Sequence, residues 1–309
     1  MKDKPLVSVI IPTYNRKEKL IRLIQSIKRS SYPENKIEII VVDDASTDGT
    51  SEEIRRLFPS IKFLRNRKRL LTAGSRNVGL RNARGKYFFL IDDDNVIDEN
   101  CIKELVRVAK NNASIGIVAP IMYYLKQPNR IWCAGIRRSM ITSLTTYIGR
   151  DEFDNGQFGG LVESNDFPNA FMIKREVIEK VGPLNEKEFP IQYEEADLGE
   201  RVRRAGYAIV CNPKARVWHD IPLPEDVREK ARLFHVHEEF RAYYAGRNRI
   251  LFHRKYSNWW QFLIFILVFN WLLTLYYLGV ILVRSNSPIW RKIAVAKKYI
   301  QGVKEGLFK

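Results

Sequence analysis

The chain has 309 residues, 45% of them hydrophobic, and a formal net charge of +17 at pH 7. Its length allows one large domain or two small ones with a sizeable core, and its basic excess indicates an anionic partner such as nucleic acid, acidic lipid or a phosphorylated ligand. The three cysteines are far apart and odd in number, so neither a zinc-binding spacing nor a disulfide framework is visible, and a reducing compartment is favoured.

The first 94 residues alternate between strand-like and helix-like segments. The sequence predicts strands at residues 6–14, 36–44, 60–66 and 86–94, of which the second and fourth read as buried apolar runs. Amphipathic or capped segments between them predict helices at residues 16–30, 46–58 and 73–85. This order predicts an α/β fold with a mostly parallel, Rossmann-like sheet flanked by helices.

The middle of the chain is less regular. A strand is expected at residues 114–125, and a polar, glycine-bearing loop at residues 150–160. Two helices, each followed by glycine, and a further strand are then predicted at residues 175–182, 194–206 and 207–213.

Polar residues follow three of the predicted strands, in the stretches IIPTYN, VVDDAS and LIDDDN. In doubly wound sheets, ligands bind beyond the carboxyl ends of the strands. Asp92, Asp93 and Asp94 place three like charges after a buried strand, which is costly unless water or a cation compensates them. Asp92 and Asp94 would share one side of the strand if its geometry continued, and Mg²⁺ or Mn²⁺ prefers such oxygen ligands. A solvated turn is the alternative.

Six motifs occur in the order seen in one enzyme family: VSVIIPTYNR, IIVVDDASTDGT, AGSRNVG, KYFFLIDDDN, GPLNEKEFPIQYEEADLGERVRRAGY and VWHD. On these motifs the chain resembles the family-two glycosyltransferases, which have the GT-A fold, over residues 5–222. The resemblance implies inverting transfer of a sugar from a nucleotide-sugar, with Mn²⁺ or Mg²⁺ holding the diphosphate.

The resemblance also assigns roles to individual residues. Asp92 and Asp94 match the family's Asp-x-Asp motif, with Asp94 as the direct metal ligand, and His219 matches a position that touches the metal in some members. The alternative for His219 is a purely structural role, and the alternative for Arg76 and Asn77 is a position on the surface of a helix. Contacts to the nucleotide-sugar are implied for Pro12, Tyr14, Arg16, Asp44, Arg76, Asn77, Asp92 and Asp93.

Inverting transfer needs a carboxylate that deprotonates the attacking hydroxyl. The stretch YEEADL supplies Glu194, Glu195 and Asp197. The resemblance places Glu195 at the position of the catalytic base, which is usually Asp in the family, so the side chain here is one methylene longer. Glu194 remains the rival, and Asp197 is expected to cap or orient the helix.

The C-terminal part contains an uncharged segment, Trp259–Val283. As a helix it is long enough to cross a bilayer, and it shows no polar face. Asn270 in its middle and basic residues on both flanks are unfavourable for a simple crossing. A crossing, a re-entrant segment and packing on a second copy of the chain as a homo-oligomer therefore remain open.

These features predict four regions: a GT-A catalytic domain at 1–224, a basic amphipathic interfacial helix at 225–258, a transmembrane or re-entrant segment at 259–283, and a basic tail at 284–309. The catalytic domain is expected on the cytoplasmic face of the cell membrane, where nucleotide-sugars are made. The C-terminal segment is expected to serve location and acceptor access, not chemistry.

The expected activity is metal-dependent, inverting transfer from a UDP-, GDP- or dTDP-linked sugar to a lipid-linked saccharide or surface glycan. A polyprenyl-phosphate glycosyltransferase of the dolichyl-phosphate type is the alternative, although the stretch NVIDEN speaks mildly against it. A non-catalytic nucleic-acid binder would explain the positive charge but not the apolar segment, so no nucleic acid partner is expected.

Overall fold

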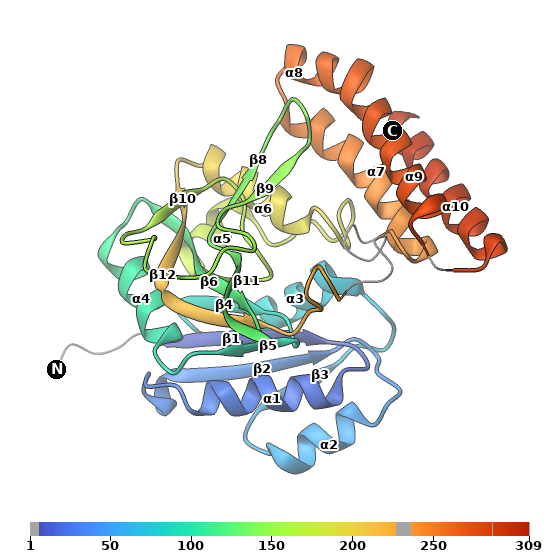
Figure 1. The fold of residues 1–309 in the computed structure, drawn as a ribbon. Coiled ribbons are helices and arrows are strands. Elements are labelled where there is room, and N and C mark those ends of the chain that lie inside the picture. The colour runs from blue at the N-terminus through green and yellow to red at the C-terminus, as the bar shows by residue number, and fades with distance from the viewer. Residues whose placement is uncertain (1–5, 227–235, 286, 309) are drawn as a thin grey trace. The chain divides into compact units, whose positions relative to one another are not determined.

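The computed structural model describes residues 6–226, 236–285 and 287–308. Two compact units divide the chain and are described separately. Unit 1 comprises Met1–Arg137, Thr146–Pro190 and Glu194–Ile221, and unit 2 comprises Arg138–Thr145, Ile191–Tyr193 and Pro222–Lys309. Figure 1 follows the chain from the N-terminal strands to the C-terminal helices. Two short pieces from the middle of the chain thus group with the C-terminal helices.

Unit 1 is built on a ten-stranded mixed sheet. The four predicted N-terminal strands pair in parallel, in the order β3-β2-β1-β4: β1 (Val7–Thr13), β2 (Ile37–Asp43), β3 (Lys62–Arg65) and β4 (Tyr87–Ile91). The sheet continues with β11 (Ala170–Lys174), antiparallel to β4, then β6 (Ile115–Tyr124) and β12 (Ala208–His219). Its shorter members are β5 (Asn95–Ile97), β7 (Gln127–Cys133) and β10 (Val162–Ser164). A separate ribbon consists of β8 (Ile136–Arg138) and β9 (Thr145–Tyr147).

Helices cover both faces of this sheet, because successive strand residues point to opposite sides. On β1, Val9 and Ile11 belong to one apolar cluster and Ile10 to the other. The first cluster is covered by α1 (Lys17–Lys28), α2 (Thr50–Leu57) and α4 (Cys101–Asn111). The second is covered by α3 (Leu71–Asn82), α5 (Arg175–Val181) and α6 (Glu194–Arg204). The predicted α/β fold with helices on both faces is confirmed.

Unit 2 is largely helical. Its elements are α7 (Glu239–Tyr256), α8 (Trp259–Ile264), the π-helical stretch η3 (Phe265–Phe269), α9 (Asn270–Val283) and α10 (Ile289–Phe308). The run from α8 through η3 to α9 is continuous. In the described part of the chain, it is the one helix long and apolar enough to cross a membrane.

The helix α7 covers much of the region predicted to lie at the membrane interface, while residues 227–235 of that region lie outside the described residues. Residues 246–253 of α7 are all buried. Ala242 and Ile250 share an apolar cluster with Tyr299 and Val303 of α10. The apolar side of α7 therefore makes contacts inside unit 2, and the interfacial position of residues 225–258 stays a prediction.

Glycines let α7 and α10 approach closely. A Cβ added to Gly302 would lie 2.0 Å from the carbonyl oxygen of Tyr243, and one added to Gly306 would lie 2.9 Å from the carbonyl oxygen of Arg247. Gly246 faces α10 in the same way, 2.8 Å from the carbonyl oxygen of Tyr299. Small residues spaced along one helix face permit this backbone contact.

Gly302→Ala is expected to destabilise the protein, because the new methyl group can fit only if the two helices move apart. Overpacking of this kind costs roughly 1–3 kcal/mol of unfolding free energy. Gly279→Ala in α9 is the matched control, since nothing lies within 4 Å of a Cβ at that position. Chemical unfolding of the full chain in detergent measures both, and equal stability of the two variants would contradict the close helix contact.

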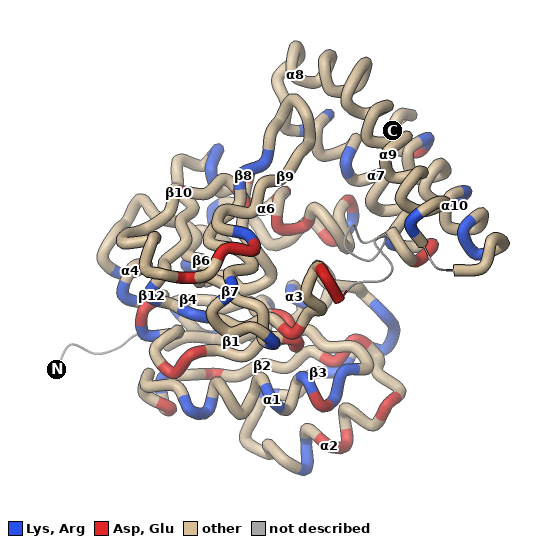
Figure 2. Tube along the Cα trace, viewed as in Figure 1, with Lys and Arg blue, Asp and Glu red and all other residues tan. Residues whose placement is uncertain are grey.

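The polarity of the continuous α8–α9 helix is reversed relative to a helix at a water surface. Its polar residues point inward: Asn270 and Thr274 are buried and accept hydrogen bonds from Arg249 Nη2 at 3.1 and 3.0 Å. Arg249 Nη1 also donates to the Tyr299 hydroxyl at 2.9 Å. The exposed side is apolar: Trp259, Trp260, Leu263, Ile264, Leu267, Val268, Trp271, Leu272, Leu275, Tyr276, Leu282 and Val283. We call these residues the apolar face; Figure 2 shows the absence of charge along α8 and α9.

This arrangement accounts for Asn270 in the middle of an apolar segment. A polar group there is costly unless it is paired, and its partner is Arg249 of the same chain. Asn270 Oδ1 is thereby satisfied, whereas the buried Nδ2 of the same residue has no hydrogen-bond partner in the described part of the chain.

Candidate active site

The three carboxylates after β4 lie in a turn. β4 ends at Ile91, and β5 begins only at Asn95. The strand geometry that would put Asp92 and Asp94 on one side does not continue. Asp92 Oδ1 instead accepts a hydrogen bond from Arg76 Nη2 at 2.8 Å, and Asp94 Oδ2 accepts one from Arg16 Nη1 at 2.8 Å. The two carboxylates are thus compensated by different cations.

Asp93 and Asp94 connect the end of β4 to the end of β1. Arg16 Nη1 lies 3.1 Å from Asp93 Oδ1 as well as 2.8 Å from Asp94 Oδ2. The Thr13 hydroxyl donates to Asp93 Oδ2 at 2.7 Å. The stretches IIPTYN and LIDDDN therefore meet at the carboxyl-end edge of the sheet, and Asp93 has a defined structural partner on each side.

His219, the last residue of β12, faces the same carboxylate cluster. Strand pairing sets His219 opposite Asn95 of β5, and its Nε2 lies 3.4 Å from Asp94 Oδ1. Asn169 Nδ2 is 3.3 Å from the same ring nitrogen, and the Trp132 ring meets the imidazole edge-on at 4.7 Å. The structure thus brings together two of the three residues predicted at the metal, Asp94 and His219, whereas the third, Asp92, faces Arg76.

The two buried carboxylates of this cluster have different acidities. Burial raises the pKa of Asp93 to about 7, although Arg16 opposes the shift. Burial also acts to raise the pKa of Asp94, but His219 and Arg16 outweigh it and hold that pKa well below its usual range. Asp94 therefore carries its full negative charge at neutral pH.

The donor atoms at this position fit a divalent cation. Asp94 Oδ1 is buried and makes no hydrogen bond among the described residues, and His219 Nε2 lies 3.4 Å from it, so a carboxylate oxygen and an imidazole nitrogen face each other here. Among residues 6–226, 236–285 and 287–308, no group of three or more His, Cys, Asp or Glu side chains is arranged to hold a metal. Mg²⁺ and Mn²⁺ do not need an all-protein cage, since one or two protein ligands commonly combine with substrate phosphates and water. Asp94 and His219 meet that lower requirement.

The start of α6 brings Glu194 and Glu195 to the same region. Arg76, which is fully buried, donates to Glu195 Oε1 at 2.6 Å and to Asp92 Oδ1 at 2.8 Å. The Glu195 side chain is 20% exposed, whereas Glu194 is buried and its burial raises its pKa well above the ordinary value. Glu195 is therefore the more accessible carboxylate of the two.

Asp44 organises the loop that follows β3. Its carboxylate accepts hydrogen bonds from Asn66 Nδ2 at 2.9 Å and from the backbone N–H groups of Leu70 and Leu71 at 2.7 and 2.9 Å. A carboxylate offers about four lone-pair positions, so roughly one acceptor position is left for a ligand. Asp44 thus combines a structural role with limited capacity for the predicted nucleobase contact.

Tyr14 and Pro12 lie at the end of β1. The Arg69 guanidinium stands 3.9 Å above the Tyr14 ring, a cation–π distance. Pro12 is half-buried and sits opposite Val42 of β2. These contacts place both residues at the edge formed by the ends of β1 and β2, where the nucleotide was predicted to bind.

The Arg-Asn pair of α3, for which a ligand contact was predicted, makes its contacts within the protein. Asn77 Nδ2 donates to the Leu184 carbonyl at 2.8 Å and to Glu186 Oε2 at 2.9 Å, and its Oδ1 accepts from Leu184 N–H at 3.0 Å. Both amide hydrogens are therefore used within the protein. Arg76 likewise binds Asp92 and Glu195, so both residues hold other parts of the site in place.

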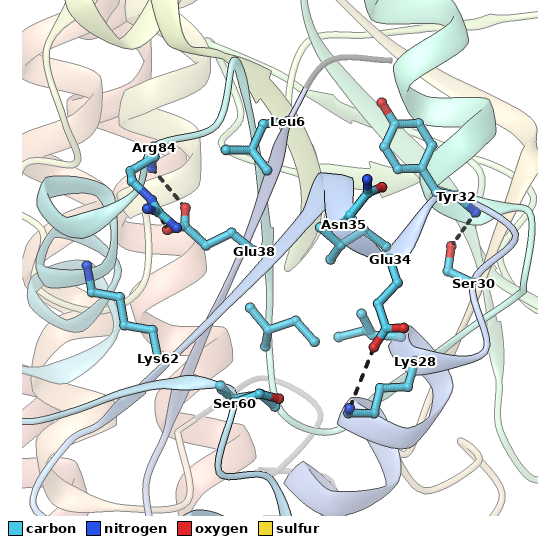
Figure 3. Close-up of a pocket in the computed structure, with 14 residues that line it drawn as sticks. Leu6, Lys28, Ser30, Tyr32, Glu34, Asn35, Glu38, Ser60, Lys62 and Arg84 are labelled. Carbon is cyan, nitrogen blue, oxygen red and sulfur yellow. Dashed lines mark hydrogen bonds and ion pairs between the residues drawn. The ribbon is translucent and has the colours of Figure 1, made fainter. Parts of the chain in front are cut away.

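A cavity of about 470 Å³ lies away from these residues. It is lined by residues at the start of β1, β2 and β3, the opposite edge of the sheet (Figure 3). Two of its three cations face carboxylates in its own wall, with Arg84 2.9 Å from Glu38 and Lys28 4.0 Å from Glu34, and the third, Lys62, donates to the Asn82 carbonyl at 2.8 Å. The residues predicted for the site lie at the carboxylate cluster, and none of them lines this cavity.

Four residues contribute to the site without having been singled out from the sequence: Thr13, Trp132, Asn169 and Asp220. The Asp220 N–H donates to the Asp94 carbonyl at 2.8 Å. Its side chain pairs with Lys19 at 3.2 Å and with Arg22. Asp220 and Thr13 lie inside the quoted motifs, so their positions were a signal, whereas Trp132 and Asn169 are brought in only by the sheet.

Known proteins resemble this chain in sequence. An uncharacterized protein of Sinorhizobium fredii, y4gI, is 30% identical over 252 residues, covering 76% of this chain and 27% of its own length. A poly(ribitol-phosphate) beta-N-acetylglucosaminyltransferase of Staphylococcus aureus, TarP, is 33% identical over 111 residues, which is 35% of this chain and 34% of the relative. The chain spans about a third of the length of these curated relatives.

The fold is also shared with solved structures. A mannosyltransferase from Pyrobaculum calidifontis, solved in complex with GDP-Man and Mn²⁺, superposes with a TM-score of 0.57 at 17% identity, covering 99% of this chain and 88% of that one. A sequence profile of the family described as Glycosyl transferase family 2 matches residues 8–182, more than half of the chain. The motifs, the GT-A fold and this match agree: the chain belongs to glycosyl transferase family 2.

Proposed function

We propose that this glycosyltransferase moves a sugar, with inversion, from a nucleotide-sugar to a lipid-linked saccharide or surface glycan at a membrane. The observation that carries the proposal is the convergence of Asp94 and His219 at the strand ends, with Glu195 linked to the same turn through Arg76 and Asp92. Separate groups for the diphosphate and for the acceptor are what such a transfer requires.

The roles divide between the two sides of the turn. Asp94 and His219 would hold a Mn²⁺ or Mg²⁺ ion, which when bound neutralises charge on the leaving diphosphate. Arg16 stands beside them as a further cation for phosphate oxygens. Asp44 and Tyr14 would frame the nucleotide. Glu195, held by Arg76, would take the proton from the acceptor hydroxyl.

The donor is proposed to be a UDP-, GDP- or dTDP-linked sugar. The mannosyltransferase of similar fold was solved with GDP-Man and Mn²⁺, and the staphylococcal relative is named for transferring N-acetylglucosamine. The test is a screen of UDP-, GDP- and dTDP-sugars for thermal stabilisation and slow donor hydrolysis, with Mn²⁺ or with a chelator. A response to none of these donors in the presence of Mn²⁺ would contradict the proposal.

The acceptor is proposed to lie at a membrane, with the catalytic unit on the cytoplasmic face. The supporting observation is the apolar face of α8 and α9, which would be unfavourable in water. The chain's positive charge suits acidic lipid. Product analysis identifies the acceptor: a sugar on a saccharide supports the proposal, and a sugar attached directly to a lipid phosphate contradicts it.

Leu275→Glu is expected to reduce binding to liposomes severalfold, because it places a charge in the centre of the apolar face, where Leu275 is 68% exposed. Gln301→Glu in α10 is the matched control, since it adds the same charge at an exposed polar position. Co-flotation with liposomes that contain acidic lipid measures both. Equal flotation of the two variants would show that the apolar face does not contact lipid.

A further inference from the structure

The two residues before Glu194, the first residue of α6, have a strained backbone. Gln192 and Tyr193 have φ angles of +59° and +69°, in the left-handed region that residues with a Cβ rarely adopt. Such conformations persist only where surrounding contacts hold them. The next two residues are Glu194 and Glu195, which begin α6. The backbone at 192–193 therefore directs how both carboxylates enter the helix.

One side chain of α7 holds this strained segment. Asn248 is fully buried, and its Nδ2 donates to the carbonyl oxygen of Ile191 at 2.9 Å and to that of Gln192 at 3.0 Å. Both amide hydrogens are thereby used. Because these carbonyls lie on either side of the Gln192 backbone, the amide fixes the first of the two left-handed residues.

A further set of contacts fixes the amide itself. Arg247 Nη1 donates to Asn248 Oδ1 at 2.7 Å, which orients the amide with Nδ2 towards the carbonyls. Arg247 Nε lies 3.2 Å from Glu305 Oε1 of α10, and Tyr243 donates to the same carboxylate. The contacts run from α10 through α7 to the backbone that precedes the two glutamates.

The ring of Tyr193 is also enclosed. Arg138 lies 4.8 Å from its centroid, and the Phe252 ring of α7 lies 5.3 Å away. The Tyr193 side chain is therefore held by packing contacts of its own. The Asn248 amide acts separately, on the backbone of the same segment.

We propose that Asn248 is a positioning residue for sugar transfer, which keeps Gln192 and Tyr193 in the left-handed conformation that aims Glu195 at the acceptor. The inference rests on the proposed function, in which Glu195 is the base. It gives the C-terminal helices a part in the chemistry, unlike the expectation that they serve only location and acceptor access.

Asn248→Asp tests this role in the full chain, purified in detergent. Aspartate has the same shape and still accepts from Arg247, but it has no hydrogen for the two carbonyls. We expect kcat to fall by about 10- to 100-fold, because a misplaced catalytic group costs up to about 10²-fold. The affinity for the nucleoside diphosphate with Mn²⁺ should change less than about twofold, because the Asn248 side chain contacts no residue that is proposed to bind the nucleotide.

A double-mutant cycle separates positioning from a general structural effect. If Asn248 acts through Glu195, adding Asn248→Asp to Glu195→Gln should cost little further activity. Ser257→Ala is the matched control: it removes a similar side-chain contact, from Ser257 Oγ to the Met140 carbonyl at 3.1 Å, elsewhere in unit 2. This control should keep kcat within about twofold of the parent.

Hydrogen–deuterium exchange gives a readout that does not depend on activity. Asn248→Asp should speed exchange in peptides that contain residues 191–197 and leave β1 and β4 unchanged. Unchanged exchange there, a kcat within about twofold of the parent, fully multiplicative losses in the cycle, or loss of cooperative unfolding would each overturn the positioning role. Faster exchange in Asn248→Asp together with a fully active Glu195→Gln would instead overturn the role of Glu195. It would leave intact the conclusion that Asn248 holds the backbone of residues 191–193.

Discussion

Asp94→Ala is expected to abolish Mn²⁺-dependent binding of the nucleotide-sugar while the protein stays folded. The substitution removes the oxygen that lies 3.4 Å from His219 Nε2 and the ionised carboxylate that Arg16 contacts. Residues that only support metal ligands cost about 10–100-fold in affinity when replaced, so loss of a direct ligand should cost more than about 100-fold. Isothermal titration of the donor with Mn²⁺ and with a chelator measures the effect.

The control for this variant is Glu104→Ala. It also removes a carboxylate that pairs with arginine, at 2.8 Å from Arg107, but on the surface of α4. Donor affinity should be unchanged in the control, and both variants should unfold cooperatively. An unchanged Mn²⁺-dependent donor affinity in Asp94→Ala would remove Asp94 from the metal site.

The N-terminal half of unit 1 is the part that local sequence patterns predict well. Each buried strand there is a short apolar run, such as Phe88–Ile91, and each ends in polar residues at the same edge. Parallel strands bring their carboxyl ends together, so the meeting of Thr13 with Asp93 follows from the topology. The spacing of apolar residues and the residues at the turns were sufficient to predict the strands and helices of this region.

The direction of each carboxylate in the turn after β4 was not predictable from spacing. Period two would have held only if the strand continued, but the chain turns at Asp92–Asp94. The turn is compensated by Arg16 and Arg76, each of which pairs with one part of it. Such long-range ion pairs depend on how strands and helices are arranged, and no local pattern contains that information.

The strand that delivers His219 was predicted too short. The predicted strand stopped at Pro213, a residue that cannot donate to a sheet ladder. β12 instead continues past an irregularity in its register between Asn212 and Arg216, where a bulge accommodates the proline. This extension carries the strand to His219 and so completes the candidate metal site.

The partner of Asn270 was likewise invisible in the sequence. A polar residue within an apolar segment predicts a partner but does not identify it, because any neighbouring helix can supply one. The partner is Arg249, which comes from α7 and is itself buried. The basic residues before the apolar segment therefore include at least one that stabilises the helical unit from within.

Glu195→Gln is expected to lower the rate of sugar transfer by about 10²–10⁴-fold while donor binding stays intact. In the unsubstituted protein, Arg76 Nη1 donates to Glu195 Oε1 at 2.6 Å. Glutamine keeps an oxygen that can accept this hydrogen bond, so the local structure should persist. What the substitution removes is the capacity to take a proton from the acceptor hydroxyl. Single-turnover transfer at saturating donor measures this step apart from binding.

Glu194→Gln is the matched comparison, and the two glutamates should differ because their surroundings differ. Burial raises the pKa of Glu194 well above its ordinary value, which favours the protonated carboxyl that glutamine resembles. Glu195 keeps a 20% exposed side chain that an acceptor can reach. We therefore expect Glu194→Gln to retain most of the transfer rate. A severe loss in Glu194→Gln, together with a nearly active Glu195→Gln, would move the catalytic base one residue towards the N-terminus, directly after the strained segment that Asn248 holds.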